Sequence, residues 1–427
     1  MVDVWTEQAI LVRAGAQPNE ALGVSAAISG NSLIMSAITA GDDFESAHTG
    51  HVYSFSLPSR EPTEFPWGAG SAQDYGVSMA AAGDLLVVGQ TYAYVPNSPG
   101  RVFIFRKTGE TWTPEATISS PGTVDSPRFF GATVSTDGQD VLVGGQGRAF
   151  VYVQDGGKWV VQAEIGPVGG DGDSGFFGST SVAIANGIAL VGDPLGGFTT
   201  INGSQTEATG RVTSFKREGG VWSSLGWLSS PEGSSSSFGT AVAAKDGFAA
   251  IADLRRAKIY SFRLEGDSWL EAQVLTAAPA SKLAFDGEHL VAANAQYGDG
   301  GALNPALIFE RVGYSFQPLA ELQPKDSSAA EFGDAVAVSG NYVLVTATSG
   351  NQSKGAGYVY TIDRTSIAGG EAAGTGEGTA AVDSDSACSF SPSSADQHLR
   401  SSAAGWPLAI VVLGCAIWRK VRVVGSN

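Results

Sequence analysis

Residues 130–145, FGATVSTDGQDVLVGG, contain the pattern that decides the fold of this chain. Two short apolar runs flank the turn signal Asp137-Gly138, and the aromatic-glycine pair Phe130-Gly131 precedes them. Asp-Gly and Asn-Gly favour type I′ turns, and Gly-Asn and Gly-Asp favour type II′ turns; both types match the twist of two antiparallel strands. The stretch therefore predicts a β-hairpin with a two-residue turn.

The same pattern recurs along the chain with a mean interval of about 52 residues, close to the period of β-propeller blades. Each signal lies between two apolar runs, as in SMAAAGDLLVVG and AVAVSGNYVLVT. The seven turn signals are Gly30-Asn31, Gly83-Asp84, Asp137-Gly138, Asn186-Gly187, Asp246-Gly247, Asp286-Gly287 and Gly340-Asn341.

Each repeat also predicts two further strands. A third apolar run follows the hairpin, as in GRVFIF and GRVTSF, and a fourth run usually opens with a tryptophan: Trp112, Trp159, Trp222 and Trp269. The first run follows an aromatic-glycine pair in most repeats, although the first repeat has Leu22-Gly23 and the sixth lacks the pair. Four strands repeated seven times predict an all-β fold, a seven-bladed β-propeller of four-stranded antiparallel blades over residues 1–365.

The two ends of this domain are expected to complete one blade. The seventh repeat ends with GYVYTID at residue 363 and has no tryptophan-led fourth strand, whereas residues 4–12, VWTEQAILV, look like a fourth strand without a repeat. Unpaired strand edges are a liability that proteins avoid. We therefore predict that residues 4–12 pair with residues 358–362 and close the ring.

The repeats resemble the FG-GAP family, whose members include the propeller of integrin α-subunits. The resemblance is carried by FGATVSTDGQDVLVGG, FFGSTSVAIANGIALVGDP and FGDAVAVSGNYVLV, and it covers roughly residues 1–365. It implies a seven-bladed propeller and an extracellular adhesive or ligand-binding role. It names no ligand.

Composition limits the partners of the folded part. The formal net charge of −17 disfavours nucleic acid and anionic lipid surfaces as partners. The two cysteines, Cys388 and Cys415, both lie in the C-terminal tail, so residues 1–387 contain neither a disulfide framework nor a cysteine zinc site. We expect an extracellular protein or glycan as the ligand.

The tail predicts a membrane tether. Residues 366–402 are rich in Gly, Ala, Ser, Thr and acidic residues, which predicts a flexible stalk without a core. Residues 403–418, AAGWPLAIVVLGCAIW, predict a short transmembrane helix, and residues 419–427 begin with Arg419 and Lys420. The positive-inside rule places these basic residues in the cytoplasm and the propeller outside.

The orientation has an alternative, because MVDVWTEQAILVRAG is not a signal peptide. Either a leader precedes this sequence, or the protein is a tail-anchored interaction scaffold with its propeller in the cytosol. The acceptor triplets at Asn202 and Asn351 predict N-glycosylation sites if the propeller is extracellular.

Loop lengths predict the binding face. Connections from first to second and from third to fourth strand are short and regular, whereas those from second to third strand vary widely, as in AGDDFESAHTG and NAQYGDGGALNPA. Length variation on one face of a rigid scaffold is typical of a binding surface, although drift under weak constraint is an alternative. The candidate ligand-binding residues are Tyr92, Tyr94, Phe198, Tyr297, Asp42, Asp43 and Asp299.

No catalytic site is expected. The innermost strands offer Ser, Ala, Val and Thr without convergent carboxylates, which disfavours the alternative of a propeller enzyme. No cofactor is expected either, because the two-residue turns leave no room for the D-x-D-x-D-G calcium loop of integrin-type blades. Asp171 and Asp173 are the candidate cation ligands; a solvated loop between blades is the alternative.

Overall fold

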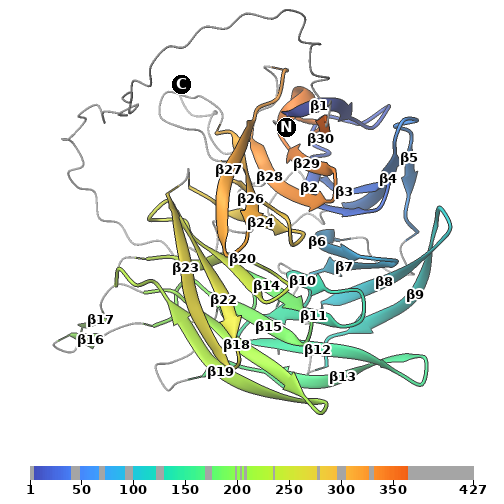
Figure 1. The fold of residues 1–427 in the computed structure, drawn as a ribbon. Coiled ribbons are helices and arrows are strands. Elements are labelled where there is room, and N and C mark those ends of the chain that lie inside the picture. Colours follow the sequence, from blue (N-terminus) through green and yellow to red (C-terminus); the bar gives the residue numbers. More distant parts are fainter. Residues whose placement is uncertain are drawn as a thin grey trace, which may run out of the picture.

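The computed structural model describes residues 4–39, 49–66, 73–91, 100–121, 129–168, 176–197, 200–201, 204–205, 209–233, 236–276, 279–295, 304–326 and 331–363. Within them, the chain forms seven four-stranded antiparallel sheets, arranged as blades around one axis (Figure 1). The innermost strands of neighbouring blades contact each other all the way round, including the last blade with the first. The predicted seven-bladed β-propeller is therefore confirmed.

Each blade runs from the axis outward in chain order. Blade 1 contains β2 (Leu22–Ser29), β3 (Ser32–Thr39), β4 (Thr49–Ser56) and β5 (Pro62–Glu64), blade 2 β6 (Tyr75–Ala82), β7 (Leu85–Gln90), β8 (Arg101–Thr108) and β9 (Thr111–Ser119), and blade 3 β10 (Thr133–Thr136), β11 (Val141–Gly145), β12 (Arg148–Asp155) and β13 (Lys158–Ile165). Blade 4 contains β14 (Val182–Ala185), β15 (Ile188–Asp193), β18 (Arg211–Glu218) and β19 (Val221–Ser229), and blade 5 β20 (Phe238–Lys245), β21 (Phe248–Asp253), β22 (Lys258–Glu265) and β23 (Ser268–Thr276).

Blade 6 follows the same order, and blade 7 takes its outermost strand from the N-terminus. Blade 6 contains β24 (Lys282–Phe285), β25 (His289–Ala293), β26 (Ala306–Val312) and β27 (Ser315–Leu322), and blade 7 β28 (Phe332–Ser339), β29 (Tyr342–Ala347), β30 (Ala356–Asp363) and β1 (Val4–Leu11). The connection between β15 and β18 includes the small hairpin of β16 (Thr200–Ile201) and β17 (Ser204–Gln205), and α1 (Gly350–Ser353) lies between β29 and β30.

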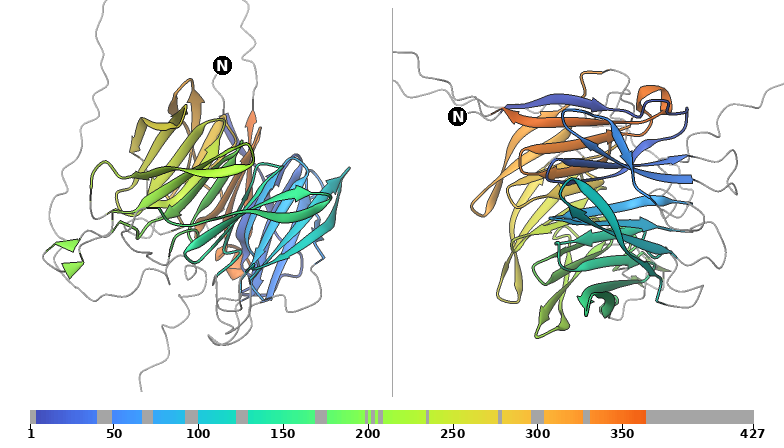
Figure 2. Two further views of the ribbon diagram at one scale, coloured as in Figure 1. Left: turned by 90° about the horizontal axis from the view of Figure 1, so that it is seen from below. Right: turned by 90° about the vertical axis from the view of Figure 1, so that its right-hand side faces the viewer.

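The ring closes where the sequence predicted it. β1 pairs with β30 in antiparallel fashion, with Trp5 opposite Ile362 and Ile10 opposite Tyr358. In the right-hand view of Figure 2, the blue strand β1 lies alongside the orange strand β30. Trp5 also packs edge-on against His289 of blade 6, with ring centroids 5.4 Å apart. The N-terminal strand thus belongs to the sheet of blade 7 and also contributes to the interface between blades 6 and 7.

The hydrophobic core is divided among the blade interfaces. The buried apolar side chains of the described residues form seven clusters, each shared by two neighbouring blades. Second strands such as β7 and β15 are buried along their whole length, because blades cover both of their faces. Their uninterrupted apolar runs, LLVV and IALV, follow from this position.

The aromatic-glycine pair fits one blade onto the next. A Cβ on Gly131 would lie 2.7 Å from the Arg101 carbonyl oxygen of the preceding blade, and Gly131 has a φ of +85° that favours glycine. In the opposite direction, a Cβ on Gly100 would lie 1.9 Å from the carbonyl oxygen of Phe130. Neither position has room for a side chain. The motif therefore marks the closest approach of two blade backbones.

The tryptophans of the fourth strands pack against the preceding blade. Each indole Nε1 donates a hydrogen bond backward around the ring, for example from Trp269 to Ser214 Oγ at 2.8 Å. The other pairs are Trp112 with Ser32, Trp159 with Glu115 and Trp222 with Gln162.

Two of the seven turns differ from the prediction. Five are two-residue turns, with pairs such as Ala185 and Ile188 closing the ladder, but Asp137-Gly138 belongs to a four-residue connection and Asp286-Gly287 to a three-residue one. The reason lies in the aspartate side chains. Asp137 Oδ1 accepts hydrogen bonds from the backbone N–H groups of Gln139 and Asp140, which stabilises the longer loop.

Candidate binding face

The two faces of the propeller differ in what their strands bring together. First strands begin, and second strands end, at the same face, so the connections from second to third strand leave from there. A cavity of about 360 Å³ lies on the axis at this face and is lined by the beginnings of all seven innermost strands. Leu254, Asn294 and Thr348, which follow the second strands of blades 5 to 7, contribute to the rim. We call this space the axial cavity.

Most of the cavity wall is neutral. Blades 1 to 5 contribute small hydroxyl and apolar residues, and several hydroxyls bridge blades: Ser78 donates to the Gly131 carbonyl at 2.8 Å, Thr133 to Gly178 at 2.6 Å and Ser181 to Gly239 at 2.7 Å. These hydroxyls stabilise the contact at three of the aromatic-glycine pairs, those of blades 3, 4 and 5. Their oxygens keep lone pairs that can accept further hydrogen bonds.

The charged residues of the wall all lie on blades 6 and 7. They are Lys282 at the start of β24, Glu331 just before β28, and Asp334 on β28. The Thr348 hydroxyl lies between the two carboxylates, at 3.1 Å from Glu331 Oε2 and in contact with Asp334 Oδ2. The backbone N–H of Thr348 also donates to Asp334 Oδ2, at 3.0 Å. One side of the cavity is thus polar and charged, and the rest of the wall is neutral.

This arrangement shifts the titration of Asp334. Burial raises the pKa of its carboxyl to about 6, and the neighbouring Glu331 charge adds to the increase, whereas the hydrogen bonds from Thr348 and the charge of Lys282 oppose it. The Thr348 hydroxyl carries one proton and can donate to only one carboxylate at a time. The Ser349 hydroxyl also donates to Glu331 Oε2, so Glu331 keeps a donor when Thr348 donates to Asp334.

The expectation that the innermost strands bring no carboxylates together is therefore wrong. Glu331 and Asp334 converge on Thr348 because the start of β28 and the end of β29 lie side by side at this face. A sequence signal was present: the residue after the aromatic-glycine pair is small or aliphatic in the other repeats, as with Val77 and Ala132, but acidic at Asp334.

Asn294 adds an amide to the same wall. Its Oδ1 accepts a hydrogen bond from Ser281 Oγ at 3.1 Å. Its Nδ2 has no hydrogen-bond partner within the part of the chain that the structure describes. Asn294 is only 4% exposed.

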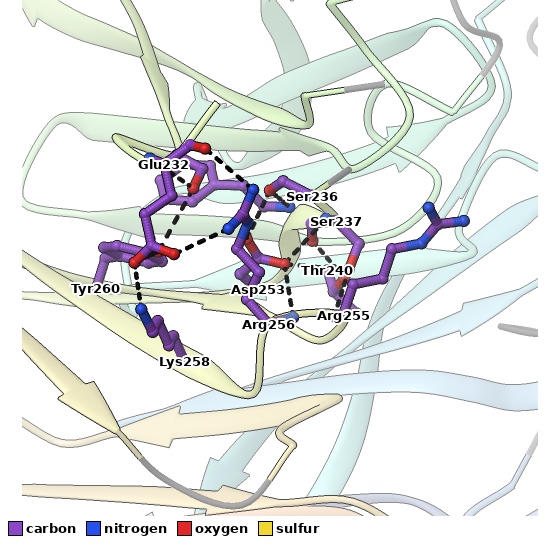
Figure 3. A network of polar contacts seen from close by, with 11 residues as sticks. Glu232, Ser236, Ser237, Thr240, Asp253, Arg255, Arg256, Lys258 and Tyr260 are labelled. Carbon is purple, nitrogen blue, oxygen red and sulfur yellow. Dashed lines mark hydrogen bonds and ion pairs between the residues drawn. The ribbon is translucent and has the colours of Figure 1, made fainter. Parts of the chain in front are cut away.

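A second polar cluster lies in blade 5 and is internally paired (Figure 3). Asp253 is fully buried and accepts hydrogen bonds from Ser236 Oγ at 2.6 Å and Ser237 N at 3.0 Å. Arg256 donates to Glu232 Oε2 at 2.8 Å, and Lys258 also pairs with Glu232. This network joins the connection from blade 4 to the end of β21. Its side chains serve the fold, and we assign no ligand to them.

Most of the residues predicted to bind ligand or metal lie outside the described residues. This applies to Tyr92, Tyr94, Phe198, Tyr297, Asp42, Asp43 and Asp299, to Asp171 and Asp173, and to the acceptor Asn202. Asn351 is described and lies in α1, in the connection between β29 and β30. Its connection leaves from the face that carries the cavity.

Two absences hold for the described residues alone. Among them, no group of three or more His, Cys, Asp or Glu side chains is placed to hold a metal ion. No helix among them is long and apolar enough to cross a membrane, and residues 366–427, with the predicted stalk, transmembrane helix and basic tail, fall outside them. These parts of the prediction stay predictions.

Comparison with known proteins identifies the fold. No family model and no curated protein matches the chain. A chain in the crystal structure of the mitotic checkpoint complex is similar with a TM-score of 0.52 and 12% identity, over 83% of this chain and 91% of that chain. A candidate 6-phosphogluconolactonase from Bacteroides uniformis is similar with a TM-score of 0.48 and 14% identity, over 74% of this chain and 89% of its own. The protein belongs to the class of seven-bladed β-propellers, and at these identities the likeness extends to the fold alone.

Proposed function

We propose that the protein is a membrane-tethered, extracellular ligand-binding or adhesion module built on a propeller of the FG-GAP type, and that it is not an enzyme. The observation that carries the proposal is the asymmetry of the two faces. One face combines the mouth of the axial cavity, its charged wall and the second-to-third-strand connections. The opposite face carries the short turns between first and second strands. A ligand that needs varied contacts finds them on the first face.

The charge of the chain supports an extracellular protein or glycan as the partner and disfavours nucleic acid. The net charge of −17 repels polyanions, whereas loops rich in Tyr and Asp suit polar or cationic groups. Catalysis is not part of the proposal, because Thr348 engages both carboxylates, Asp334 through its backbone N–H and Glu331 through its hydroxyl, and no histidine lines the described cavity wall.

The binding face is tested by replacing Tyr92, Tyr94 and Tyr297 together with alanine in the full chain. We expect the variant to keep its melting temperature and to lose binding to cell surfaces or to a glycan array. The control is Tyr314→Ala, which removes a tyrosine that is 65% exposed in the turn between β26 and β27, on the opposite face. Binding that survives the triple change and is lost in the control would contradict the proposal.

The tether and its orientation are tested by adding protease to intact cells. If residues 403–418 span the membrane with the propeller outside, cleavage within residues 366–402 releases a soluble domain. The motivation is the charge asymmetry at Arg419, Lys420 and Arg422. A propeller protected from external protease would instead support the tail-anchored cytosolic scaffold.

A further inference from the structure

The charged wall of the axial cavity presents donors and acceptors side by side. Lys282 and the Asn294 amide are donors, and the carboxylates of Glu331 and Asp334 are acceptors. The Asn294 Nδ2 group is itself buried behind the wall and has no hydrogen-bond partner among the described residues, although buried amide donors are nearly always hydrogen-bonded. It donates to a ligand once the Asn294 side chain turns toward the cavity.

We propose that the axial cavity binds a neutral polyhydroxylated ligand of the size of a monosaccharide. Each hydroxyl of such a ligand both donates and accepts, so it matches a wall on which carboxylates stand beside an ammonium and an amide. The proposal goes beyond the adhesion function, because it concerns a small ligand in the cavity and uses none of the loop residues assigned to binding a larger partner.

The neutral wall suits the body of the same ligand. Val77, Met79 and Val134 contribute apolar surface to the cavity, against which the C–H groups of a pyranose can pack. The hydroxyls of Ser78 and Thr133 donate to backbone carbonyls and keep lone pairs that accept from ligand hydroxyls. The cavity volume of about 360 Å³ lies at the lower end of the range of small-molecule sites, about 300–1,000 Å³.

A cationic ligand fits this wall less well. Lys282 lies close enough to Asp334 to lower its pKa, and an ammonium bound between the two acids would stand near that positive charge. The burial that raises the pKa of Asp334 to about 6 also lowers the negative charge of the wall in mildly acidic solution. A neutral ligand is not repelled by Lys282, and its binding does not depend on the negative charge of Asp334.

The test is a ligand-observed NMR titration of the full chain with D-glucose, D-galactose, D-mannose and N-acetyl-D-glucosamine, and with ethanolamine as a small cation. We expect at least one sugar to bind saturably. Removing one charged partner of a hydrogen bond costs enough to weaken binding about tenfold, so Lys282→Met and Asp334→Asn should each have this effect. The matched control is Lys245→Met, which changes a lysine at the far end of β20, outside the cavity wall.

Three results would overturn the proposal: no sugar binds, a sugar binds with the same affinity to wild type and to both cavity variants, or ethanolamine binds in place of the sugars. Presenting the same sugar as the terminal residue of a bead-bound glycan distinguishes a free ligand from a glycan end, and binding in either form supports the proposal. The melting temperature of each variant shows that the propeller is folded. Cell binding by the variant at Tyr92, Tyr94 and Tyr297 is measured separately. A loss of the adhesion function is therefore distinguishable from a failure of sugar binding in the cavity.

Discussion

At the scale of single residues, the glycine of the aromatic-glycine pair has two separate reasons to be glycine. Its φ is positive at all five aromatic-glycine pairs, and also at Gly23 of the corresponding Leu22-Gly23 pair. At Gly131, a Cβ would also collide with the backbone of the preceding blade. The first reason concerns the local backbone, and the second concerns the blade interface, so the two can be separated by experiment.

We predict that Gly131→Ala destabilises the propeller more than Gly156→Ala. Both residues have positive φ, and alanine there costs about 1–2 kcal/mol. Gly156 lies in the turn between β12 and β13, where an added Cβ would have no atom within 4 Å, so this variant incurs only the backbone cost. Gly131→Ala must in addition move the Arg101 carbonyl. Urea unfolding of the two variants measures the difference, and equal losses of stability would contradict the assigned role.

Asp334 gives a second prediction at this scale, about pH. Its pKa is raised in the folded state to about 6, so between its unfolded value near 3.8 and pH 6 the folded protein binds more protons than the unfolded chain. Stability contributed by this group is therefore lost as the pH rises through that window. Asp334→Asn should flatten the dependence of melting temperature on pH between 4 and 6. The control Asp155→Asn, at the exposed end of β12, should keep the wild-type profile.

At the scale of elements, the fourth strands hold each blade to the one before it. Their tryptophans were readable from the sequence, but a second shared feature was not. The register shifts by one residue between third and fourth strands in blades 2 to 7, for example between Ser261 and Phe262. A bulge of this kind increases the local twist, and no residue type in these strands predicts its position. Sequence patterns therefore predict strand pairing more reliably than they predict strand register.

We predict that Trp269→Phe lowers the free energy of unfolding by about 1 kcal/mol, because it removes the hydrogen bond to the buried hydroxyl of Ser214. The phenyl ring retains most of the packing between blades 4 and 5. Trp227→Phe is the matched control, since the ring of Trp227 is 50% exposed on the outer strand β19. Chemical denaturation of both variants measures the effect. A larger loss in the Trp227 variant would argue against the interblade bond.

At the scale of the whole molecule, the sequence predicted the fold much further than the site. Periodic turns, aromatic-glycine pairs and fourth-strand tryptophans each recur because every blade packs between two similar blades. The repeat therefore predicts the architecture. The cavity wall depends on departures from the repeat. Asp334 and Asn294 lie far apart in the chain and meet at one face only through ring geometry. The convergence of Glu331 and Asp334 on Thr348 lies within the seventh repeat, and it follows from the pairing of β28 with β29 and not from the ring.

Closure of the ring gives the last prediction. β1 completes the sheet of blade 7, and its Leu11 and Ala9 also enter the core shared by blades 7 and 1, while Trp5 enters the core shared by blades 6 and 7. Deleting residues 1–12 therefore exposes the edge of β30 and opens two of the seven interfaces at once. We expect a markedly lower melting temperature and a broader transition, because the ring loses its continuity. Deleting residues 366–427 is the control and should leave the transition unchanged. Since each interface relies on both of its blades, an unchanged melting curve after loss of β1 would mean that the other interfaces hold the ring without closure.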